Sequence, residues 1–439
     1  MVLSEAGVNI LGTSAKNVDL AEDRSKFSAL LDQLGISQPK WSKLQSIEEA
    51  KHFAQKIGYP VIIRPSYVLS GSAMRVAYNE SALENFLNLA ARVSRDHPVV
   101  ISKFITRAKE VEVDGVSDGE NVFIGAIMEH VENAGVHSGD ATMVIPPQAL
   151  KLEVQKNIEA ITLSIVKALK IHGPYNIQYL VKDDVVNVIE CNLRASRSMP
   201  FVSKIRGINL IELAALAMLG RKIDCLNLSP MTVAPHVGVK VPQFSFMRLS
   251  GADPVLGVEM LSTGEVACLG KNFSDAFFKA LQAAEFNIPP SGGSVLISIG
   301  GDEERKTRIV PIAKSLVDMG FKIYATMNTA KVLNANGLAV IVLHKVRSPE
   351  VTPNILDYLQ ERKIDLVINV PIAKKRSNIA DIITDGYVIR RQAVEFNIPV
   401  ITNIQLAEAL VEVLKTKAQN GNDIRSLNEY MADLPWKHW

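Results

Sequence analysis

Residues 175–192 read YNIQYLVKDDVVNVIECN, and the expected fold class rests on this segment. Two runs rich in β-branched and aromatic residues, Tyr175 to Val181 and Val185 to Cys191, flank a polar turn at residues 182–184. Such a pattern predicts a β-hairpin, in which the two strands run antiparallel. An antiparallel pair with helices beside it favours an α+β region over a doubly wound parallel sheet.

Further strand patterns extend from this hairpin toward the N-terminus. Each is a short apolar run bounded by polar or glycine-containing segments. The strands are expected at residues 60–64, 74–78, 99–104, 111–116 and 121–128, and a helix is expected at 152–169. The loop Ser66 to Ser72 lies between the first two strands, and its backbone N–H groups could cover phosphates. It lacks the Gly-Lys-Ser/Thr of a Walker A loop, and a hairpin loop without function is an equal alternative.

The first residues predict a strand and a helix. Val8 to Gly12 (VNILG) has the pattern of a short buried strand that ends in a glycine turn. It is expected to be the last strand of an α/β domain whose earlier strands are missing. Thr13 or Ser14 would then cap a helix over residues 19–34, which carries apolar side chains on one face.

A domain boundary is expected at residues 289–293, which read PPSGG. Beyond it, strand and helix patterns alternate, which predicts a small parallel α/β sheet of about five strands. These strands are expected at residues 295–299, 321–325, 338–343, 366–370 and 400–402. The last residues, with Trp436 and Trp439, are polar and are expected to form a short helix or a tail.

The composition excludes several classes of protein. The chain has 439 residues, 47% hydrophobic and 21% charged, which is typical of a folded chain with substantial cores. A net charge of +2 gives no electrostatic reason to expect nucleic acid or a membrane as partner. The widely spaced cysteines show no metal-binding pattern and favour a reducing compartment: Cys191, Cys225 and Cys268. We expect a cytoplasmic protein, or a mitochondrial one if a targeting segment lies outside this chain.

The hairpin also carries residues suited to a metal site. Glu190 and Asn192 are two apart on one strand, so their side chains point to the same face, and Gln178 on the facing strand could reach it. Carboxylate and amide oxygens are hard ligands that suit Mg²⁺. Arg194 and Arg197 follow and could hold a phosphate or a carboxylate. Taken alone, a polar strand end with solvated arginines is the commoner explanation.

Two other segments contain candidate site residues. Residues 110–114 (EVEVD) alternate acidic and apolar side chains, so one carboxylate could accept hydrogen bonds from a ribose. On its own, a solvated sheet face explains this pattern better. His137 lies in a glycine-flanked turn, residues 135–140 (GVHSGD), where it could contact a reacting group. A lone histidine there is more often structural, and no GxSxG elbow indicates a hydrolase.

Five sequence blocks, in this order, closely resemble the C-terminal half of the carbamoyl-phosphate synthetase large chain, an ATP-grasp enzyme. The blocks are AEDR (21–24), RPSYVLSG (64–71), EHVENAGVHSGD (129–140), ECNLRASR (190–197) and STGE (262–265). The resemblance runs almost from end to end and is greatest to eukaryotic-type members. The segment after Gly293 resembles the methylglyoxal-synthase-like regulatory domain, which identifies the C-terminal rather than the N-terminal half. It implies a remnant of a pre-ATP-grasp domain at 1–22, an ATP-grasp domain at 23–288 and a regulatory domain at 294–439.

The resemblance also implies a role for each matching residue. The nucleotide would be bound by Arg24 and Arg64 at its phosphates, by Lys103, Phe104 and Ile105 at adenine, by Glu110 at the ribose, and by Gly135, Val136, His137 and Ser138 beside the reacting centre. Gln178, Glu190 and Asn192 would bind Mg²⁺ or Mn²⁺, with Gln178 and Glu190 also at the nucleotide. Arg194 and Arg197 would hold phosphate or carbamate and, with His137, act in catalysis. The implied reaction transfers the γ-phosphoryl group of ATP to carbamate.

The implied partners are a bicarbonate-phosphorylating N-terminal half, a glutaminase (unless ammonia is used directly) and a small-molecule effector. The effector would contact Ser298, Thr326, Thr329, Lys345 and Asn369, although ordinary helix caps explain the threonines equally well. Glu304 stands where some bacterial members place a basic effector ligand, so no effector is named.

Two alternatives remain for the function. The chain could be a truncated or split fragment that binds nucleotide and effector without turnover, because only the last strand of the pre-ATP-grasp domain is expected here. A different ATP-grasp ligase is disfavoured by the regulatory domain and by the block at 129–140.

Overall fold

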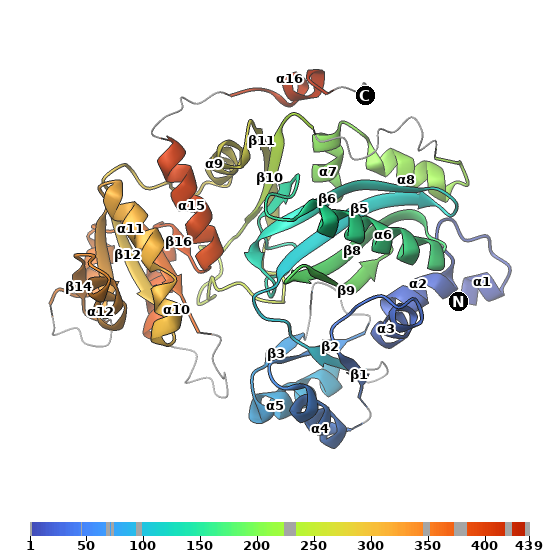
Figure 1. Cartoon of the computed structure of the whole chain (residues 1–439), viewed down its shortest axis with the longest axis horizontal. Helices are drawn as coiled ribbons and strands as arrows, with labels where there is room; N and C mark the ends of the chain where they lie inside the picture. Colours follow the sequence, from blue (N-terminus) through green and yellow to red (C-terminus); the bar gives the residue numbers. More distant parts are fainter. Residues whose placement is uncertain are drawn as a thin grey trace.

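The structure is a computed structural model, and it describes residues 2–44, 46–66, 71, 74–93, 99–223, 234–345, 352–372, 384–417 and 424–434. Within these ranges the chain forms three β-sheets, of four, seven and five strands. Figure 1 shows the seven-stranded sheet in the middle, the four-stranded sheet below it and the five-stranded sheet at one side. No helix in these ranges is both long enough and apolar enough to cross a membrane.

The N-terminal segment differs from the expectation. The predicted strand at Val8 to Gly12 is wrong: these residues are neither helix nor strand, and Leu11 is 59% exposed. An apolar run forms a strand only where a neighbouring strand completes the backbone ladder. Here the attachment is made by a side chain instead, because the Thr13 hydroxyl donates to the carbonyl of His172 and accepts from its N–H.

The single helix expected at 19–34 is two helices. The structure has α1 (Val2–Glu5), α2 (Ala15–Glu22) and α3 (Arg24–Gln33). Ser14 caps α2, as the sequence suggested, by accepting from the N–H of Asn17. Asp23 breaks the run because its carboxylate accepts from the N–H groups of Ser25 and Lys26 and so starts a new helix.

The four-stranded sheet is antiparallel, in the order β1-β4-β2-β3. Its elements are β1 (Trp41–Lys43), α4 (Ile47–Ile57), β2 (Val61–Pro65), β3 (Arg75–Ala77), α5 (Glu80–Val93) and β4 (Val99–Lys103). Apolar side chains of the two helices pack against the strands and form a small separate core, which includes Ala54, Ile63 and Leu83. Most of the loop 66–72 lies outside the described residues.

The seven-stranded sheet is also antiparallel, in the order β11-β10-β7-β6-β5-β8-β9. The predicted hairpin forms its β8–β9 edge. Its elements are β5 (Lys109–Asp118), β6 (Val122–Asn133), β7 (Met143–Ile145), α6 (Leu152–Ala168), β8 (His172–Lys182), β9 (Val185–Asn192), α7 (Met199–Arg206), α8 (Leu210–Met218), β10 (Val237–Gln243), β11 (Gly264–Gly270) and α9 (Phe273–Ala283). One core lies where α3 and α6 pack on the sheet, and a second lies under α7 and α8.

The five-stranded sheet is parallel, in the order β14-β13-β12-β15-β16. The elements are β12 (Ser294–Ile299), α10 (Glu303–Thr307), α11 (Val310–Asp318), β13 (Lys322–Thr326), α12 (Met327–Ala335), β14 (Ile341–Leu343), α13 (Ile355–Gln360), β15 (Leu366–Val370), α14 (Asp385–Glu395), β16 (Val400–Ile401), α15 (Ile404–Lys417) and α16 (Leu427–Ala432). All five predicted strands are present. The expected fold class, an α+β region followed by a small parallel α/β sheet, is therefore confirmed.

The parallel sheet is attached firmly to the seven-stranded sheet. One hydrophobic core continues from α9 and β10 into the parallel sheet and α15, and Figure 1 shows α15 lying beside α9. Arg390 of α14 makes a bidentate ion pair with Asp253, with N–O distances of 2.8 and 2.7 Å. The short helix α16 crosses back, where the Tyr430 hydroxyl donates to the carbonyl of Leu269. The expected short C-terminal helix is thus present, and Trp436 and Trp439 lie outside the described residues.

Candidate active site

A cleft lies between the four-stranded and seven-stranded sheets. It is bordered by strands from both sheets, by α3 and by the turn at residues 134–138. The predicted site residues that line it are Arg24, Arg64, Lys103, Ile105, Glu110, Gly135, Val136, His137, Ser138, Gln178, Glu190, Asn192 and Arg194. The fold therefore brings together segments that are up to about 170 residues apart in the chain.

Glu190 is held between two arginines. Its Oε2 lies 3.0 Å from Nη1 of Arg24, at the start of α3, and 3.5 Å from Nη2 of Arg64 on β2. Burial would raise the pKa of Glu190, but the two guanidinium groups outweigh it and hold that pKa at about 2. The carboxylate is therefore ionised at any physiological pH, and Arg64 is almost entirely buried against it.

The three predicted metal ligands lie on neighbouring strands. Gln178 is the register partner of Glu190 across β8 and β9, and Asn192 is two residues further along. Nδ2 of Asn192 donates to Oε1 of Glu190 at 3.3 Å and to Oδ1 of Asn176 at 3.2 Å. One permanently charged carboxylate and two amide oxygens at one edge of the cleft fit the oxygen ligands that Mg²⁺ takes. The donor set therefore suits a hard divalent cation.

The acidic row on β5 is buried, so the solvated sheet face considered for it is wrong. Glu110, Glu112 and Asp114 are at most 6% exposed, because the neighbouring strands and helices cover this face. Burial and the nearby Glu112 raise the pKa of Glu110 well above its usual value, although the Gly135 N–H donates to its carboxyl group. Glu110 lines the cleft and can present either a donor or an acceptor to a hydroxyl there.

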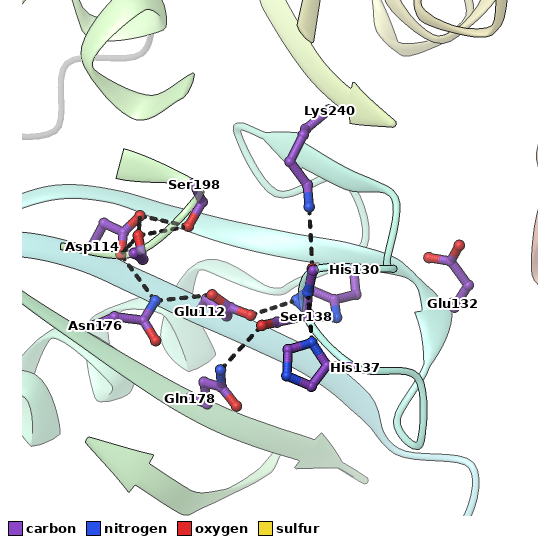
Figure 2. A network of polar contacts seen from close by, with 12 residues as sticks. Glu112, Asp114, His130, Glu132, His137, Ser138, Asn176, Gln178, Ser198 and Lys240 are labelled. Carbon is purple, nitrogen blue, oxygen red and sulfur yellow. Dashed lines mark hydrogen bonds and ion pairs between the residues drawn. The ribbon is translucent and has the colours of Figure 1, made fainter. Parts of the chain in front are cut away.

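Beneath the cleft, Glu112 and Asp114 of this acidic row contact Asn176 and His130, two residues to which the sequence reasoning gave no role. Figure 2 shows the Asn176 amide between two carboxylates, and Nδ2 of Asn176 lies 2.9 Å from both Glu112 Oε2 and Asp114 Oδ1. Glu112 is also 3.1 Å from Nε2 of His130. Because Asn176 in turn accepts from Asn192, this row fixes one predicted metal ligand from below.

Asp114 anchors the segment that carries the two candidate catalytic arginines. Its carboxylate accepts from the hydroxyls of Ser196 and Ser198, each at 2.7 Å. Burial and the charge of Glu112 raise the pKa of Asp114 to about 6, even though these hydrogen bonds oppose the shift. The spacing of acidic residues on β5 indicated a polar face, but only the fold shows that this carboxylate holds the turn after β9.

The two arginines differ in position. Arg194 lines the cleft, is exposed, and donates to Oδ1 of Asn192 at 3.4 Å. Arg197 does not line the cleft; its Nε lies 3.3 Å from Oε2 of Glu265, and Nη1 contacts Sδ of Met260. The structure thus brings Arg194 to the site and leaves Arg197 beside it, paired with the STGE block.

The glycine-rich turn borders the cleft and holds His137 in place. Gly135 has φ of +114°, a conformation that side chains with Cβ rarely adopt, which explains the glycine there. The His137 N–H donates to the carbonyl of Gly257, and its Nδ1 accepts from the N–H of Gly139. Burial lowers the pKa of His137, so the ring is neutral at pH 7 and carries its proton on Nε2.

Two further residues that hold this turn, Asp140 and Lys240, were given no role by the sequence reasoning. The Asp140 carboxylate is fully buried and accepts from the N–H groups of Leu261 and Ser262, each at 2.8 Å. Lys240, on β10, is fully buried and donates from Nζ to the carbonyl of Ser138 at 3.1 Å (Figure 2). Nothing in the apolar run around Lys240 marked it, although a lysine inside a strand pattern of that kind is itself unusual.

Lys103 lies at the cleft, and its ammonium group is hydrogen-bonded to the backbone. Its Nζ donates to the carbonyls of Gly58 and Tyr59, at 2.8 and 3.0 Å. These bonds tie β4 to the turn before β2. Phe104 and Ile105 follow it and line the same end of the cleft.

Most of the predicted effector residues lie at or near the carboxyl ends of neighbouring strands of the parallel sheet. Thr326, at the end of β13, lies 3.3 Å from the hydroxyls of Ser298 and Thr329. Thr326 precedes α12 but makes no side-chain cap bond, whereas Thr329 accepts from the N–H of Ile299. The ordinary-cap explanation is therefore wrong for Thr326.

The other two predicted effector residues interact with neighbouring side chains. Asn369 is the register partner of Ser298, and its Oδ1 accepts from Nη1 of the buried Arg390 at 2.7 Å. Lys345 is exposed and lies 3.4 Å from Asp385. The hydroxyl groups of Ser298, Thr326 and Thr329 thus form a cluster, with Asn369 on the strand next to Ser298. Lys345 lies apart from them and pairs with Asp385 at the start of α14.

Sequence comparisons bear on both regions. The family described as "Carbamoyl-phosphate synthase L chain, ATP binding domain" matches residues 23–226, and the "MGS-like domain" matches residues 308–402. The chain is 45% identical over 444 residues to "Carbamoyl phosphate synthase large chain, C-terminal section" of Methanocaldococcus jannaschii, covering 99% of this chain and 70% of that protein. It is 48% identical over 422 residues to "Multifunctional protein URA2" of Saccharomyces cerevisiae, covering 94% of this chain. The chain spans only 19% of the length of that relative.

Solved structures share the fold at low sequence identity. The biotin carboxylase of Campylobacter jejuni, solved as a complex with a β,γ-ATP ligand, aligns with a TM-score of 0.54 and 18% identity, over 65% of this chain and 73% of that one. An N5-carboxyaminoimidazole synthase from Aspergillus clavatus, solved with ADP and a ribonucleotide, aligns with a TM-score of 0.52 and 12% identity, over 64% of this chain and 79% of that one. At such identities the likeness shows an ATP-grasp type of fold and nothing about substrate.

Proposed function

The chain belongs to the carbamoyl-phosphate synthase large-chain family, and from this premise we propose that its cleft transfers the γ-phosphoryl group of ATP to carbamate. The observation that carries the proposal is the group of Arg24, Arg64 and Glu190, with Gln178 and Asn192 beside it. Positive charge, a charged carboxylate and amide oxygens at one place suit a transferring phosphoryl group and its divalent cation.

In the proposed reaction, a carbamate oxygen forms a bond to the γ-phosphorus while the bond from that phosphorus to the β,γ-bridging oxygen breaks. The products are carbamoyl phosphate and ADP. Such a transfer needs little covalent chemistry from the protein; it needs in-line positioning and neutralised charge on the moving oxygens. The residues of the cleft are therefore assigned to binding, orientation and charge.

The phosphate end of the cleft supplies the charge. Arg24 and Arg64 approach from two different elements and would contact the phosphates, while Glu190 between them keeps the guanidinium groups in place. Gln178, Glu190 and Asn192 would hold Mg²⁺, which would neutralise charge on the phosphates when bound. Mn²⁺ is an alternative occupant of the same oxygen ligands.

The glycine-rich turn and β5 would orient the nucleotide. Glu110 would bind the ribose, because its raised pKa leaves it able to donate or accept at a hydroxyl. His137 is neutral, and its Nε2–H would donate to a phosphoryl oxygen rather than remove a proton. Lys103, Phe104 and Ile105 would line the adenine end. Arg194, which is exposed and lines the cleft, would bind phosphate or carbamate. Arg197 would serve the same ligands from its position beside Glu265.

The partners and the effector remain part of the proposal. We propose that a bicarbonate-phosphorylating half supplies carbamate, using nitrogen from a glutaminase or from free ammonia, and that a small-molecule effector binds the cluster at Ser298, Thr326, Thr329 and Asn369. Relatives carry names of both multifunctional proteins and an ammonia-type mitochondrial synthase, which supports a link to further domains. We also propose a division into an ATP-grasp domain at 23–288 and a regulatory domain at 294–439.

The reverse reaction tests the proposal without a carbamate source. The purified chain is mixed with MgADP and carbamoyl phosphate, and ATP formation is followed. We expect ATP from the wild type and a loss of at least about a thousandfold in Glu190→Ala, because the charge of Arg24 and Arg64 is left unbalanced and a metal ligand is lost. Glu153→Gln, an exposed acid on α6 outside the cleft, is the control and should keep full activity. A folded wild type that binds ADP but forms no ATP would contradict the proposal.

A further inference from the structure

Lys240 is a fully buried lysine that no step of the proposed reaction uses. It lies on β10 between apolar residues and is 1% exposed. Lysine is almost never fully buried without a partner, because removing its ammonium group from water is costly. Burial lowers the pKa of Lys240, while the carboxylates of Glu112, Glu265 and Glu132 act against that shift and Arg197 adds to it.

The hydrogen bond of Lys240 ends on the turn that borders the cleft. Within the described residues, its Nζ has one hydrogen-bond acceptor, the backbone carbonyl of Ser138 at 3.1 Å. Figure 2 shows Lys240 reaching down from β10 to this turn, with His137 on the opposite side. The carboxylates that face Lys240 are further away and form no ion pair with it in this part of the chain. The ammonium group is therefore directed to one backbone carbonyl.

The turn that Lys240 contacts is also held by other groups. At its far end, the Asp140 carboxylate accepts from the N–H groups of Leu261 and Ser262, and the Ser262 hydroxyl donates to the carbonyl of Gly139. Gly135 donates to Glu110, His137 donates to the carbonyl of Gly257, and Nε2 of Gln178 lies 3.4 Å from Oγ of Ser138. These contacts fix the turn from the cleft and from the loop at 257. Lys240 contacts the turn from β10, and its charged group binds the carbonyl of Ser138, the residue that follows His137 and whose hydroxyl lies near Gln178.

We propose that Lys240 is a positioning residue for phosphoryl transfer, which holds the Ser138 carbonyl and through it the backbone of His137 and Ser138 at the reacting centre. The inference rests on the proposed function of the same cleft. A hydrogen bond from a charged donor is stronger than a neutral one, so it fixes this carbonyl more firmly than an amide would. Lys240 touches no substrate in this role.

Kinetics of the Lys240→Met variant test the role. Methionine keeps the unbranched apolar stem and removes the ammonium group. We expect kcat for ATP formation from MgADP and carbamoyl phosphate to fall about 10- to 100-fold, since a small misplacement of a reacting group has effects of that size. KM for MgADP should change less than about twofold, because Arg24, Arg64 and Glu110 keep their contacts. A purely structural role would lower the active fraction and the thermal stability together, without this split.

The matched control is Lys306→Met. Lys306 is a lysine of α10 that is 8% exposed and also donates to a backbone carbonyl, that of Gly301, in the C-terminal region. We expect its kcat and KM to equal those of the wild type. An unchanged kcat in Lys240→Met, or equal losses in both variants, would overturn the inference.

A second measurement is independent of turnover. Hydrogen exchange of the backbone amides at residues 134–141 should be faster in Lys240→Met than in the wild type, and unchanged in Lys306→Met. If the wild type forms no ATP, the proposed function fails and the exchange result alone decides the role of Lys240: equal exchange rates overturn it.

If Lys240→Met does not fold, a double substitution can test the same role. Lys240→Met combined with Glu132→Gln removes one of the facing carboxylates together with the ammonium group, so the site carries no additional unbalanced charge. Oε1 of Glu132 is buried without a hydrogen-bond partner among the described residues, so an amide nitrogen in its place breaks no hydrogen bond, and the amide oxygen can still accept from the Thr142 N–H. We expect the same loss of kcat and the same faster exchange in the folded double variant, and wild-type values there would overturn the inference.

Discussion

The cleft and the hydroxyl cluster of the parallel sheet are two candidate ligand sites built in opposite ways. At the cleft, Glu190 lies between Arg24 and Arg64, and buried acids stand on β5 behind it. At the parallel sheet, Ser298, Thr326 and Thr329 contact one another without a charge among them. The first site is organised by charge. The three hydroxyl groups of the second are joined by neutral hydrogen bonds, and a charged group, Arg390, contacts only the neighbouring Asn369.

The difference follows from the two kinds of sheet. In the antiparallel sheet, side chains from neighbouring strands face one another along their length, so Gln178, Glu190 and Asn192 can form a row. In the parallel sheet, the strand ends meet the starts of helices, and small hydroxyl residues gather there, as Thr326 does between β13 and α12. Charge suits phosphoryl transfer, whereas hydroxyls at helix starts suit recognition of an anion without reaction.

The strongest test of the charged site is the removal of one arginine. Arg64→Met removes the more buried of the two guanidinium groups beside Glu190. We expect ATP formation to fall about a thousandfold, equivalent to about 4 kcal/mol of barrier, because the phosphates lose a buried donor. The measurement is kcat in the reverse reaction, with circular dichroism to show that the variant is folded. A loss below tenfold would mean that charge does not organise the cleft.

The next effect concerns the contact that joins the two regions. Arg390→Met leaves Asp253 without its bidentate partner and Asn369 without its donor. Since a buried ion pair is broken on one side, we expect the free energy of unfolding to fall by about 3 kcal/mol. Urea denaturation measures this change. Lys415→Met, at an exposed pair on α15, should change it by less than about 0.5 kcal/mol.

A third prediction uses pH to test a buried acid of the seven-stranded sheet, Glu132 on β6. Burial raises the pKa of Glu132 to about 7. A raised carboxyl pKa means that stability is complete below the unfolded-state pKa, near 4.5, and is lost as pH rises through about 7. The Glu132→Gln variant has no carboxyl group to titrate. Between pH 5 and pH 8, the wild type should therefore lose about 2 kcal/mol more unfolding free energy than the variant does. Denaturant curves at the two pH values measure it, and parallel curves for both proteins would contradict the assignment.

The hydroxyl cluster is tested by a substitution with a modest expected effect. Thr326→Val replaces the hydroxyl that lies between Ser298 and Thr329 with a methyl group of similar size. We expect a loss of about 1 kcal/mol in unfolding free energy, since two weak hydrogen bonds disappear, and no change in ATP formation without effector. Thermal unfolding and the reverse reaction measure both. A tenfold loss of kcat would mean that the hydroxyl cluster belongs to the reaction itself.

Local patterns predicted much of the fold because they depend on neighbouring residues. The hairpin at 175–192 and all five parallel strands follow from runs of apolar residues and turns. Two errors had different causes. Val8 to Gly12 pairs with no strand among the described residues, and strand pairing depends on distant segments. Asp23 divides one expected helix into two through a local cap to Ser25 and Lys26, which the apolar pattern did not show. The candidate residues at Arg24, Arg64 and Glu190 came from sequence blocks, and the fold placed them together.

Most of the strands, the family and the chemical types of residue at the site follow from the amino-acid sequence. Which of these side chains are buried, and what they contact, depends on the folded arrangement of distant segments. Alternation on β5 shows that Glu110, Glu112 and Asp114 share one face, but whether that face meets water or protein depends on distant strands. The same holds for Lys240, whose neighbours come from strands far away in the chain. Burial and charge pairing are properties of packing between remote segments, so they set pKa values and contacts that no local pattern contains.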